Sequence, residues 1–268
     1  MSEWRFLPAI DNRGWMHMAM DVALLEAVQN GLSAPILRFY RWRPACMTLG
    51  KFQPAEGNIN IDRCREMGID ISRRPTGGRA IFHDDEVTFS VIITEKDLPD
   101  AGSNVMDSYR VLGAAMVSGM QKLGLPAELV DIHANSFSEA ASVSATANPA
   151  CFAARARCDL MVNGAKIIGS AQMRRDGVIL QQNSLPLNIN FPVWEEIFYR
   201  SDWEKVAAGK AVSLNEAAGR NVSEDEVINA LKAGFAEEFG TVWIDSKITV
   251  EEMKRAEELA DGLKVFSN

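Results

Sequence analysis

Apolar residues recur at helical spacing in several stretches of the chain. Over residues 12–30 they are Trp15, Met18, Val22, Leu25 and Val28, and Asn30-Gly31 supplies a stop at the C-terminal end. This spacing predicts a core-facing helix. Similar patterns predict helices over residues 61–67 and from Ser103, a candidate N-cap, to Gly124. Two capping boxes, Ser223-x-x-Glu226 and Thr249-x-x-Glu252, predict the start of two more helices.

Runs of branched and aromatic residues predict strands between these helices. They cover residues 36–42, 46–50, 69–72, 86–94, 127–131, 159–162, 166–173 and 178–182. Asn163-Gly164 and Asp176-Gly177 stand between the last three runs, and such pairs favour the tight turns of β-hairpins. Three consecutive antiparallel strands are therefore expected near the middle of the chain.

Helices interleaved with largely antiparallel or mixed sheets indicate the α+β class. We expect one main domain over residues 1–268, with a helical C-terminal portion from about residue 192 to residue 268. Residues 133–150 are dominated by Ala, Ser, Asn and Thr. Because little in this stretch can be buried, the sequence predicts a mobile loop there, of the kind that often binds or covers a site.

Composition narrows the possible settings of the protein. With 268 residues and 47% apolar composition the chain can bury a large core, and its apolar runs are too short to span a bilayer. No leader peptide is recognised, so a soluble cytoplasmic protein is expected. The net charge of −8 argues against a nucleic-acid or membrane-surface binder. The four cysteines lack CxxC spacing and the three histidines are far apart, so neither disulfides nor a zinc site is expected.

The stretch from Arg73 to Asp84 combines features of a ligand-binding turn. Gly77-Gly78 permits positive φ and close approach by a ligand, and successive backbone N–H groups in such a turn can form an anion-binding concavity. Three arginines flank the turn. The stretch therefore predicts a site for an anionic or carbonyl ligand, and the ordinary alternative is a hairpin turn with solvated arginines.

Cys151 is the candidate nucleophile because it directly follows the predicted mobile loop. Positive neighbours (Arg155, Arg157 and Lys166) would lower the pKa of its thiol and favour the thiolate. Cys158 is the competing cysteine, and we expect it to be packed beside a strand. The alternative is that Cys151 is a small buried hydrophobic residue with no catalytic role.

Two further residues are candidates for chemistry. Lys166 lies in an apolar strand, where Gly169-Ser170-Ala171 would leave room for a ligand against the sheet. An exposed strand lysine is the alternative. His83 could orient a carbonyl group or carry a proton, and the alternative is a hydrogen-bonded turn histidine.

Two motifs in fixed order carry a resemblance to a known family. The first runs from Arg73 to His83 as Arg-Arg-Pro-Thr-Gly-Gly-Arg-Ala-Ile-Phe-His, and the second from Val162 to Gln172 as Val-Asn-Gly-x-Lys-Ile-Ile-Gly-Ser-Ala-Gln. Together with residues 35–42 and 49–53, they resemble the lipoate–protein ligase and octanoyltransferase superfamily over about residues 12–190. The resemblance implies a biotin/lipoate ligase-like catalytic domain.

Two features separate the branches of this superfamily. Arg79 stands where ligases usually carry a third glycine, and Cys151 stands fifteen positions before Lys166. This arrangement is similar to that of the cysteine-dependent octanoyltransferases of lipoate synthesis. The resemblance implies that Cys151 is the catalytic nucleophile and that Lys166 lowers its pKa. It also implies a set of substrate-binding residues: Arg74, Thr76, Gly77, Gly78, Arg79, His83, Gly169, Ser170 and Ala171.

The resemblance further implies the partners. The donor would be octanoyl-acyl carrier protein, and the acceptor a lysine of a lipoyl domain, either the carrier of glycine cleavage or a dehydrogenase lipoyl domain. No metal, ATP or other cofactor is expected, and a monomer is expected. Because such partners are usually acidic, we expect a local basic face formed by arginines near the motifs: Arg73, Arg74, Arg79, Arg155, Arg157, Arg174 and Arg175.

Three alternatives remain open at this point. In an ATP-dependent lipoate–protein ligase the Gly77-Gly78 loop and Lys166 would hold an acyl-adenylate. An amidotransferase would move the acyl group between two lipoyl proteins. A non-catalytic protein would bind a lipoyl domain on the same scaffold.

Overall fold

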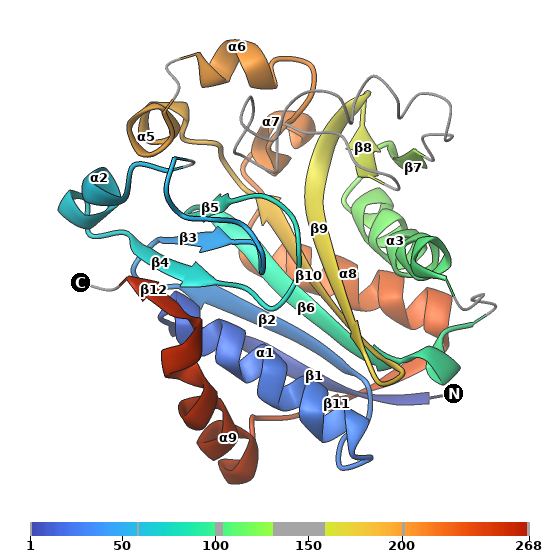
Figure 1. Cartoon of the computed structure of the whole chain (residues 1–268). Helices are drawn as coiled ribbons and strands as arrows, with labels where there is room; N and C mark the ends of the chain where they lie inside the picture. The colour runs from blue at the N-terminus through green and yellow to red at the C-terminus, as the bar shows by residue number, and fades with distance from the viewer. Residues whose placement is uncertain (1, 58, 100–103, 131–158, 200–201, 267–268) are drawn as a thin grey trace.

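Two β-sheets form the frame of the protein (Figure 1). A computed structural model describes residues 2–57, 59–99, 104–130, 159–199 and 202–266. The larger sheet has eight strands in the order β11-β1-β2-β6-β10-β9-β8-β7, and the smaller has four in the order β12-β4-β3-β5. Both sheets combine parallel and antiparallel pairs, because β1 runs parallel to β2 and β11, and β3 runs parallel to β4.

The strands have the following bounds. The larger sheet contains β1 (Ser2–Asn12), β2 (Ile36–Trp42), β6 (Glu86–Thr94), β7 (Ala127–Val130), β8 (Asp159–Val162), β9 (Ala165–Arg175), β10 (Val178–Pro186) and β11 (Thr241–Asp245). The smaller sheet contains β3 (Cys46–Leu49), β4 (Asp70–Arg73), β5 (Ile81–His83) and β12 (Lys264–Phe266).

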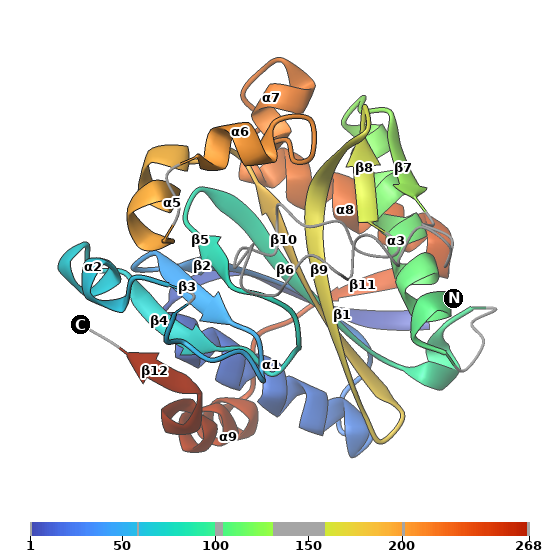
Figure 2. The same ribbon diagram turned by 45° about the horizontal axis from the view of Figure 1, so that its top comes forward.

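Helices cover both faces of the larger sheet (Figure 2). One face carries α3 (Val105–Lys122) and α8 (Glu224–Phe239), which pack with the strands into the largest apolar core. The other carries α1 (Gly14–Gln29), which packs against α9 (Val250–Ala260) and the smaller sheet. The shorter helices are α2 (Ile61–Glu66), α5 (Phe191–Ile197), α6 (Trp203–Ala207) and α7 (Leu214–Ala218).

The local patterns of the sequence are confirmed where turn chemistry or capping decides the structure. Both central residues of each predicted turn have positive φ, 50° and 79° at Asn163-Gly164 and 50° and 77° at Asp176-Gly177. These values fit type I′ turns, and β8, β9 and β10 are consecutive antiparallel strands as expected. Both capping boxes are formed.

Several elements were not predicted from the sequence. Strands β1 and β5 were missed, and the N-cap of α3 is Asn104, whose side chain accepts from the Asp107 N–H. Ser103 lies outside the described residues. The C-terminal portion is not helical throughout, because β11 forms the edge of the larger sheet and β12 the edge of the smaller one.

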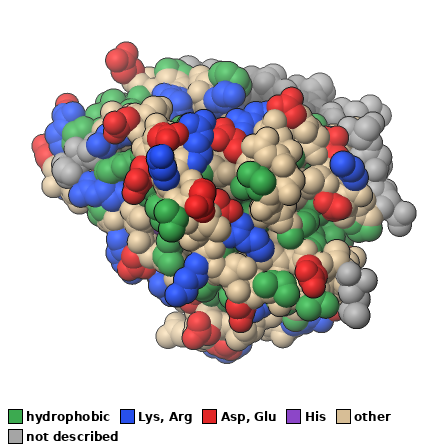
Figure 3. All heavy atoms as spheres, turned by 90° about the horizontal axis from the view of Figure 1, so that it is seen from below, with side chains coloured by type: hydrophobic (Ala, Val, Ile, Leu, Met, Phe, Trp, Pro, Cys, Tyr) green, Lys and Arg blue, Asp and Glu red, His purple; other side chains and the backbone are tan. Residues whose placement is uncertain are grey.

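The face seen from below in Figure 1 carries basic and acidic side chains side by side (Figure 3). Within the described part of this face no extended area of one charge is visible. In the same described ranges, no helix is both long enough and apolar enough to cross a membrane.

Candidate functional site

A cavity lies between the two sheets, beside the N-terminal half of α1. The empty space here is about 290 Å³ when the part open to solvent is included, and only about 20 Å³ of it can hold the centre of a water molecule. Strands β2, β3, β5, β6, β9 and β10 all contribute to its wall. The lining residues are Met18, Tyr40, Trp42, Thr48, Arg74, Ile81, His83, Thr88, Gly169, Ala171, Gln182, Asn183 and Ser184.

The cavity brings together four of the residues that the sequence singled out. Arg74 and His83 come from the first motif, and Gly169 and Ala171 come from the second. The two motifs, about 90 positions apart in the chain, therefore meet at one site. The remaining expected binding residues in the described ranges are not among the lining residues: Thr76, Gly77, Gly78, Arg79 and Ser170.

Arg74 shapes the glycine turn from inside. Its guanidinium donates to the carbonyl oxygens of Gly77 (2.7 Å), Arg79 (2.7 Å) and Thr48 (3.1 Å), and the residue is buried. The alternative of a turn with solvated arginines is therefore wrong for Arg74. Because C=O and N–H point in opposite directions across a trans peptide, the Gly78 N–H faces away from Arg74. Gly78 has a φ of 95°, which glycine adopts without strain.

A neighbouring loop is joined to the glycine turn. Arg73 donates to the carbonyl oxygens of Gly50 (2.9 Å) and Gln53 (2.7 Å), and the Lys51 N–H donates to the Thr76 carbonyl (2.9 Å). A Cβ atom at Gly50 would overlap with the Gly78 carbonyl, so the two loops require a glycine at their closest approach. The arginines of the first motif thus hold two loops together.

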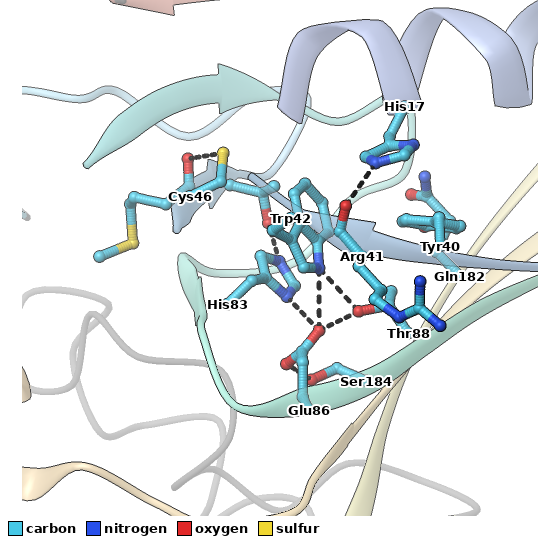
Figure 4. A network of polar contacts seen from close by, with 12 residues as sticks. His17, Tyr40, Arg41, Trp42, Cys46, His83, Glu86, Thr88, Gln182 and Ser184 are labelled. Atoms are coloured by element: carbon cyan, nitrogen blue, oxygen red, sulfur yellow. Dashed lines mark hydrogen bonds and ion pairs between the residues drawn. The ribbon is translucent and has the colours of Figure 1, made fainter. Parts of the chain in front are cut away.

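His83 is bonded at both ring nitrogens (Figure 4). Its Nδ1 lies 2.7 Å from Glu86 Oε1, and its Nε2 lies 2.8 Å from Thr48 Oγ1. The ring stacks on Trp42 with centroids 4.1 Å apart and planes 15° apart. His83 is therefore a hydrogen-bonded histidine at the end of β5 that also lines the cavity. A role in orienting a carbonyl group or carrying a proton stays a prediction.

Glu86 is a buried acid whose charge is stabilised by its neighbours. Burial by itself raises the pKa of its carboxyl group, but the electrostatic attraction of His83 and the hydrogen bonds from His83, Ser184 and Thr88 together outweigh this effect. Ser184 donates to Glu86 Oε2 (2.6 Å), and Thr88 donates to Oε1. The net pKa of Glu86 is therefore lower than its usual value.

Lys166 is buried and paired, which excludes the exposed strand lysine considered above. Only 2% of the residue is exposed, and its Nζ lies 2.7 Å from Asp159 Oδ1, which is also buried. The segment between α6 and α7 holds its backbone: the Lys166 N–H donates to the Lys210 carbonyl (2.8 Å), and the Val212 N–H donates to the Lys166 carbonyl (2.9 Å).

A β-bulge decides the side of the sheet on which Lys166 lies. Leu160 of β8 pairs with Ile168, whereas the next residue, Met161, pairs with Lys166. The extra residue Ile167 packs into the same core as Ile168. Without this bulge Lys166 and Gly169, three positions apart, would face opposite sides of the strand. With it, both face the side away from that core.

The candidate nucleophile cannot be placed. Cys151, Cys158, Arg155, Arg157 and the expected loop over residues 133–150 all lie outside the described residues. The two described cysteines are buried in apolar surroundings, which raises the pKa of the Cys64 thiol to about 12 and that of Cys46 further. Neither is suited to act as a thiolate. Among the described residues, no group of three or more His, Cys, Asp and Glu side chains is placed to hold a metal ion.

The arginines at the second turn have partners within the chain. Arg174 contacts Glu95 (2.9 Å), the Asn104 carbonyl (2.7 Å) and Ser108 Oγ (2.7 Å). Arg175 lies 3.2 Å from Glu26. These two side chains bind neighbouring elements, and their expected part in a basic face for an acidic partner stays a prediction.

Sequence reasoning missed several polar residues of the site, notably Glu86, Gln182 and Asp159. A signal was available for Asp159 and Glu86, which each begin a largely apolar strand, whereas Gln182 lies in the polar run Gln181-Gln182-Asn183-Ser184. Asp159, for example, opens the run Asp159-Leu160-Met161-Val162. What could not be seen was the partner of each side chain, because those partners lie in other elements.

The fold and the site together define an enzyme scaffold of the lipoyl-ligase type. The family model "Lipoyl protein ligase A/B catalytic domain" matches residues 13–236, and the chain belongs to this family. The match confirms the resemblance carried by the two motifs.

Curated relatives extend the match over nearly the whole chain. An octanoyltransferase LipM of Brevibacillus brevis is 36% identical, covering 97% of this chain and 95% of the relative. An octanoyltransferase LipM of Symbiobacterium thermophilum is 37% identical with the same coverage.

Solved structures confirm the α+β fold. A lipoate-protein ligase A bound with ATP is 27% identical, with a TM-score of 0.77 over 97% of this chain and 95% of that chain. A second structure is 26% identical, with a TM-score of 0.76 over 97% of this chain and 92% of that chain. It comes from a structural analysis of a bipartite lipoate protein ligase and its E2 lipoyl domain from Thermoplasma acidophilum.

Proposed function

We propose that this protein is an octanoyltransferase of lipoate biosynthesis. It moves an octanoyl group from acyl carrier protein to a lysine of a lipoyl domain, through a thioester on Cys151. The observation that carries the proposal is the set of relatives named octanoyltransferase LipM, which are 32–37% identical over most of the chain.

The cavity supports binding of an acyl chain. Large apolar side chains line much of it, among them Met18, Trp42 and Ile81, and the small residues Gly169 and Ala171 keep the β9 side open. Each buried CH₂ group of a chain contributes about 0.8 kcal/mol to binding. Because only about 20 Å³ can hold the centre of a water molecule, an octanoyl chain would gain this energy along the part open to solvent or after the lining side chains move apart.

The chemistry follows from the activated state of a thioester. The Cys151 thiolate attacks the carbonyl carbon, the bond to the carrier sulfur breaks, and the carrier leaves as a thiol after taking up a proton. The acceptor lysine, as a neutral amine, then attacks the new thioester, loses a proton and releases the Cys151 thiolate. Because the acyl group is already activated, neither step needs ATP.

Described residues supply candidates for stabilising the charge that develops. The Gly78 N–H, turned away from Arg74, is a candidate donor to the oxyanion of each tetrahedral intermediate. Lys166 supplies an ammonium group held by Asp159, and on this proposal it stabilises the Cys151 thiolate.

The acceptor proposal has independent support. The Thermoplasma structure was described together with an E2 lipoyl domain, and that ligase resembles this chain over nearly its full length. A lipoyl domain is therefore the acceptor to test first.

The direct test is a transfer assay with purified octanoyl-acyl carrier protein and a lipoyl domain, without ATP. The proposal predicts octanoylation of the lipoyl-domain lysine under these conditions. The second candidate function, an ATP-dependent lipoate–protein ligase, is favoured by the similarity to ligase A bound with ATP. It predicts modification only when free octanoate or lipoate is supplied together with ATP, and that result would refute the transferase proposal.

A further inference from the structure

A chain of buried hydrogen bonds runs from helix α1 to the glycine turn of the first motif. Gln182 Nε2 donates to Asp21 Oδ2 over 2.8 Å, and Thr76 Oγ1 donates to Gln182 Oε1 over 2.8 Å. Asp21 and Thr76 are completely buried and Gln182 is 7% exposed. The three residues come from α1, the motif turn and β10, so the chain connects three separate parts of the fold.

The Asp21 end of this chain is fixed by an ion pair. Asp21 Oδ1 accepts from Arg38 over 2.6 Å and from Ser90 over 2.8 Å, and Arg38 is only 1% exposed. A buried arginine requires a compensating negative charge, which the carboxylate supplies. An ionised carboxylate can only accept hydrogen bonds.

Because Asp21 can only accept, the donor and the acceptor of each hydrogen bond between Asp21, Gln182 and Thr76 are fixed. Because Asp21 accepts, the Gln182 amide must turn its NH₂ toward Asp21 and its oxygen toward Thr76. The Thr76 hydroxyl, facing an amide oxygen, must then act as the donor. One ion pair thus fixes the orientation of an amide that lines the cavity and of a hydroxyl in the motif turn.

Thr76 connects these hydrogen bonds to the glycine turn. Its carbonyl accepts from the Lys51 N–H, and the next residue, Gly77, is held through its carbonyl by Arg74. The turn is therefore fixed on one side by Arg74 and on the other by Gln182. Release of the Thr76 hydroxyl would leave the Gly77–Gly78 peptide attached only through Arg74 and the neighbouring backbone.

We propose that Asp21 and Gln182 are positioning residues that hold the Gly78 N–H in place through the hydroxyl of Thr76. This inference rests on the proposed octanoyl transfer, because it assigns the turn a role in that reaction. It also changes the role expected for Thr76, whose hydroxyl binds Gln182 rather than the substrate.

The matched pair Thr76→Val and Thr76→Ser tests the proposal. Valine keeps the shape of threonine and loses the hydroxyl, whereas serine keeps the hydroxyl and loses the methyl group. If the hydroxyl holds the turn, Thr76→Val lowers kcat of octanoyl transfer about tenfold, the effect of losing roughly 1.4 kcal/mol. The KM for the donor changes less than twofold, and Thr76→Ser stays close to wild type.

Other outcomes would overturn the proposal. A packing role makes Thr76→Ser worse than Thr76→Val, because serine leaves a buried gap. A direct substrate contact raises KM in Thr76→Val while kcat is unchanged. Equal activity of both variants and wild type would remove any role for the hydroxyl.

A double-mutant cycle tests the partner. Gln182→Leu should give the same loss as Thr76→Val, and the double variant should lose no more than either one, since all three lack the same hydrogen bond. Additive losses would show that the two residues act separately and would contradict the proposal.

Hydrogen exchange tests this inference independently of the proposed function. The Gly77 and Gly78 amides should exchange faster in Thr76→Val than in Thr76→Ser, whatever the reaction is. An inactive wild-type protein with this exchange difference would refute octanoyl transfer and leave the hydrogen-bond chain intact. An active wild type without the difference would refute the positioning role alone.

Discussion

The ammonium group of Lys166 lies 2.7 Å from the carboxylate of Asp159, and both side chains are buried. The two residues lie on neighbouring antiparallel strands, and a β-bulge in β9 separates the paired registers. Removing one partner of a buried ion pair leaves an uncompensated charge, which costs more than the pair itself contributes. Each side chain of the pair therefore compensates the burial of the other.

The first prediction concerns this pair. Asp159→Asn and Lys166→Met should each lower the free energy of unfolding by about 3 kcal/mol, because each removes the oppositely charged partner from a buried side chain. The double variant should be more stable than the sum of the two losses predicts. Urea unfolding measures all three variants.

An exposed ion pair provides the control for the first prediction. Asp62→Asn, which removes a surface contact with Arg65, should cost at most about 1 kcal/mol. Strictly additive losses for Asp159 and Lys166 would show that the pair is not coupled in solution.

The second prediction concerns His17 and pH. Burial, followed by the charge of Arg38, lowers the pKa of His17 well below its ordinary value of 6.5, so the folded protein holds the ring neutral. The unfolded chain takes up a proton below about pH 6.5 and the folded one does not. Stability should therefore fall as the pH drops below 6.5, by up to about 1.4 kcal/mol per pH unit from this residue.

A variant isolates this contribution of His17. The Asn side chain in His17→Asn keeps an acceptor for Arg38 and cannot titrate, so its stability should change less between pH 6.5 and 5.5 than that of wild type. Urea unfolding at the two pH values measures the difference. Identical pH dependence in both proteins would show that the pKa of His17 is the same in the folded and the unfolded protein, and would contradict the prediction.

The third prediction concerns Arg174 and Arg175, which the sequence suggested as contacts for an acidic carrier. Arg174 binds Glu95, the Asn104 carbonyl and Ser108 within the chain. Arg174→Glu should therefore lower the free energy of unfolding by about 2 kcal/mol, because charge-assisted hydrogen bonds are lost.

Kinetics with two donors decide between the structural and the docking role. If the two arginines have a structural role, the double variant Arg174→Glu/Arg175→Glu changes the activity with octanoyl-acyl carrier protein and the activity with a small octanoyl thioester by the same factor. A rise in KM for the carrier alone, with unchanged stability, would instead support docking.

How well the sequence predicts a feature of this protein depends on whether that feature is determined by neighbouring residues or by residues far apart in the sequence. The turns at Asn163-Gly164 and Asp176-Gly177 and the capping boxes are local, and they form as expected. Strand β12 has three residues and β11 has five, and each is a strand only because it pairs with a distant partner, β4 or β1. No local pattern contains that information.

The same reason limits prediction of the site. The motifs identified which segments meet, and four of the expected binding residues line one cavity. The sequence did not predict that Arg74 holds backbone carbonyls, or that Gln182 joins Asp21, a residue 161 positions away. Such pairings depend on how the sheets and α1 pack, and the residue types alone do not determine them.

The most direct test of the account is an intact-mass measurement after incubation with octanoyl-acyl carrier protein, without ATP and without acceptor. The account predicts one octanoyl group on the wild-type protein, released by hydroxylamine as a thioester should be. The adduct should be absent in Cys151→Ser and present in Cys158→Ser. A protein that acquires no adduct, stays active as Cys151→Ser and requires ATP with free octanoate would contradict the account.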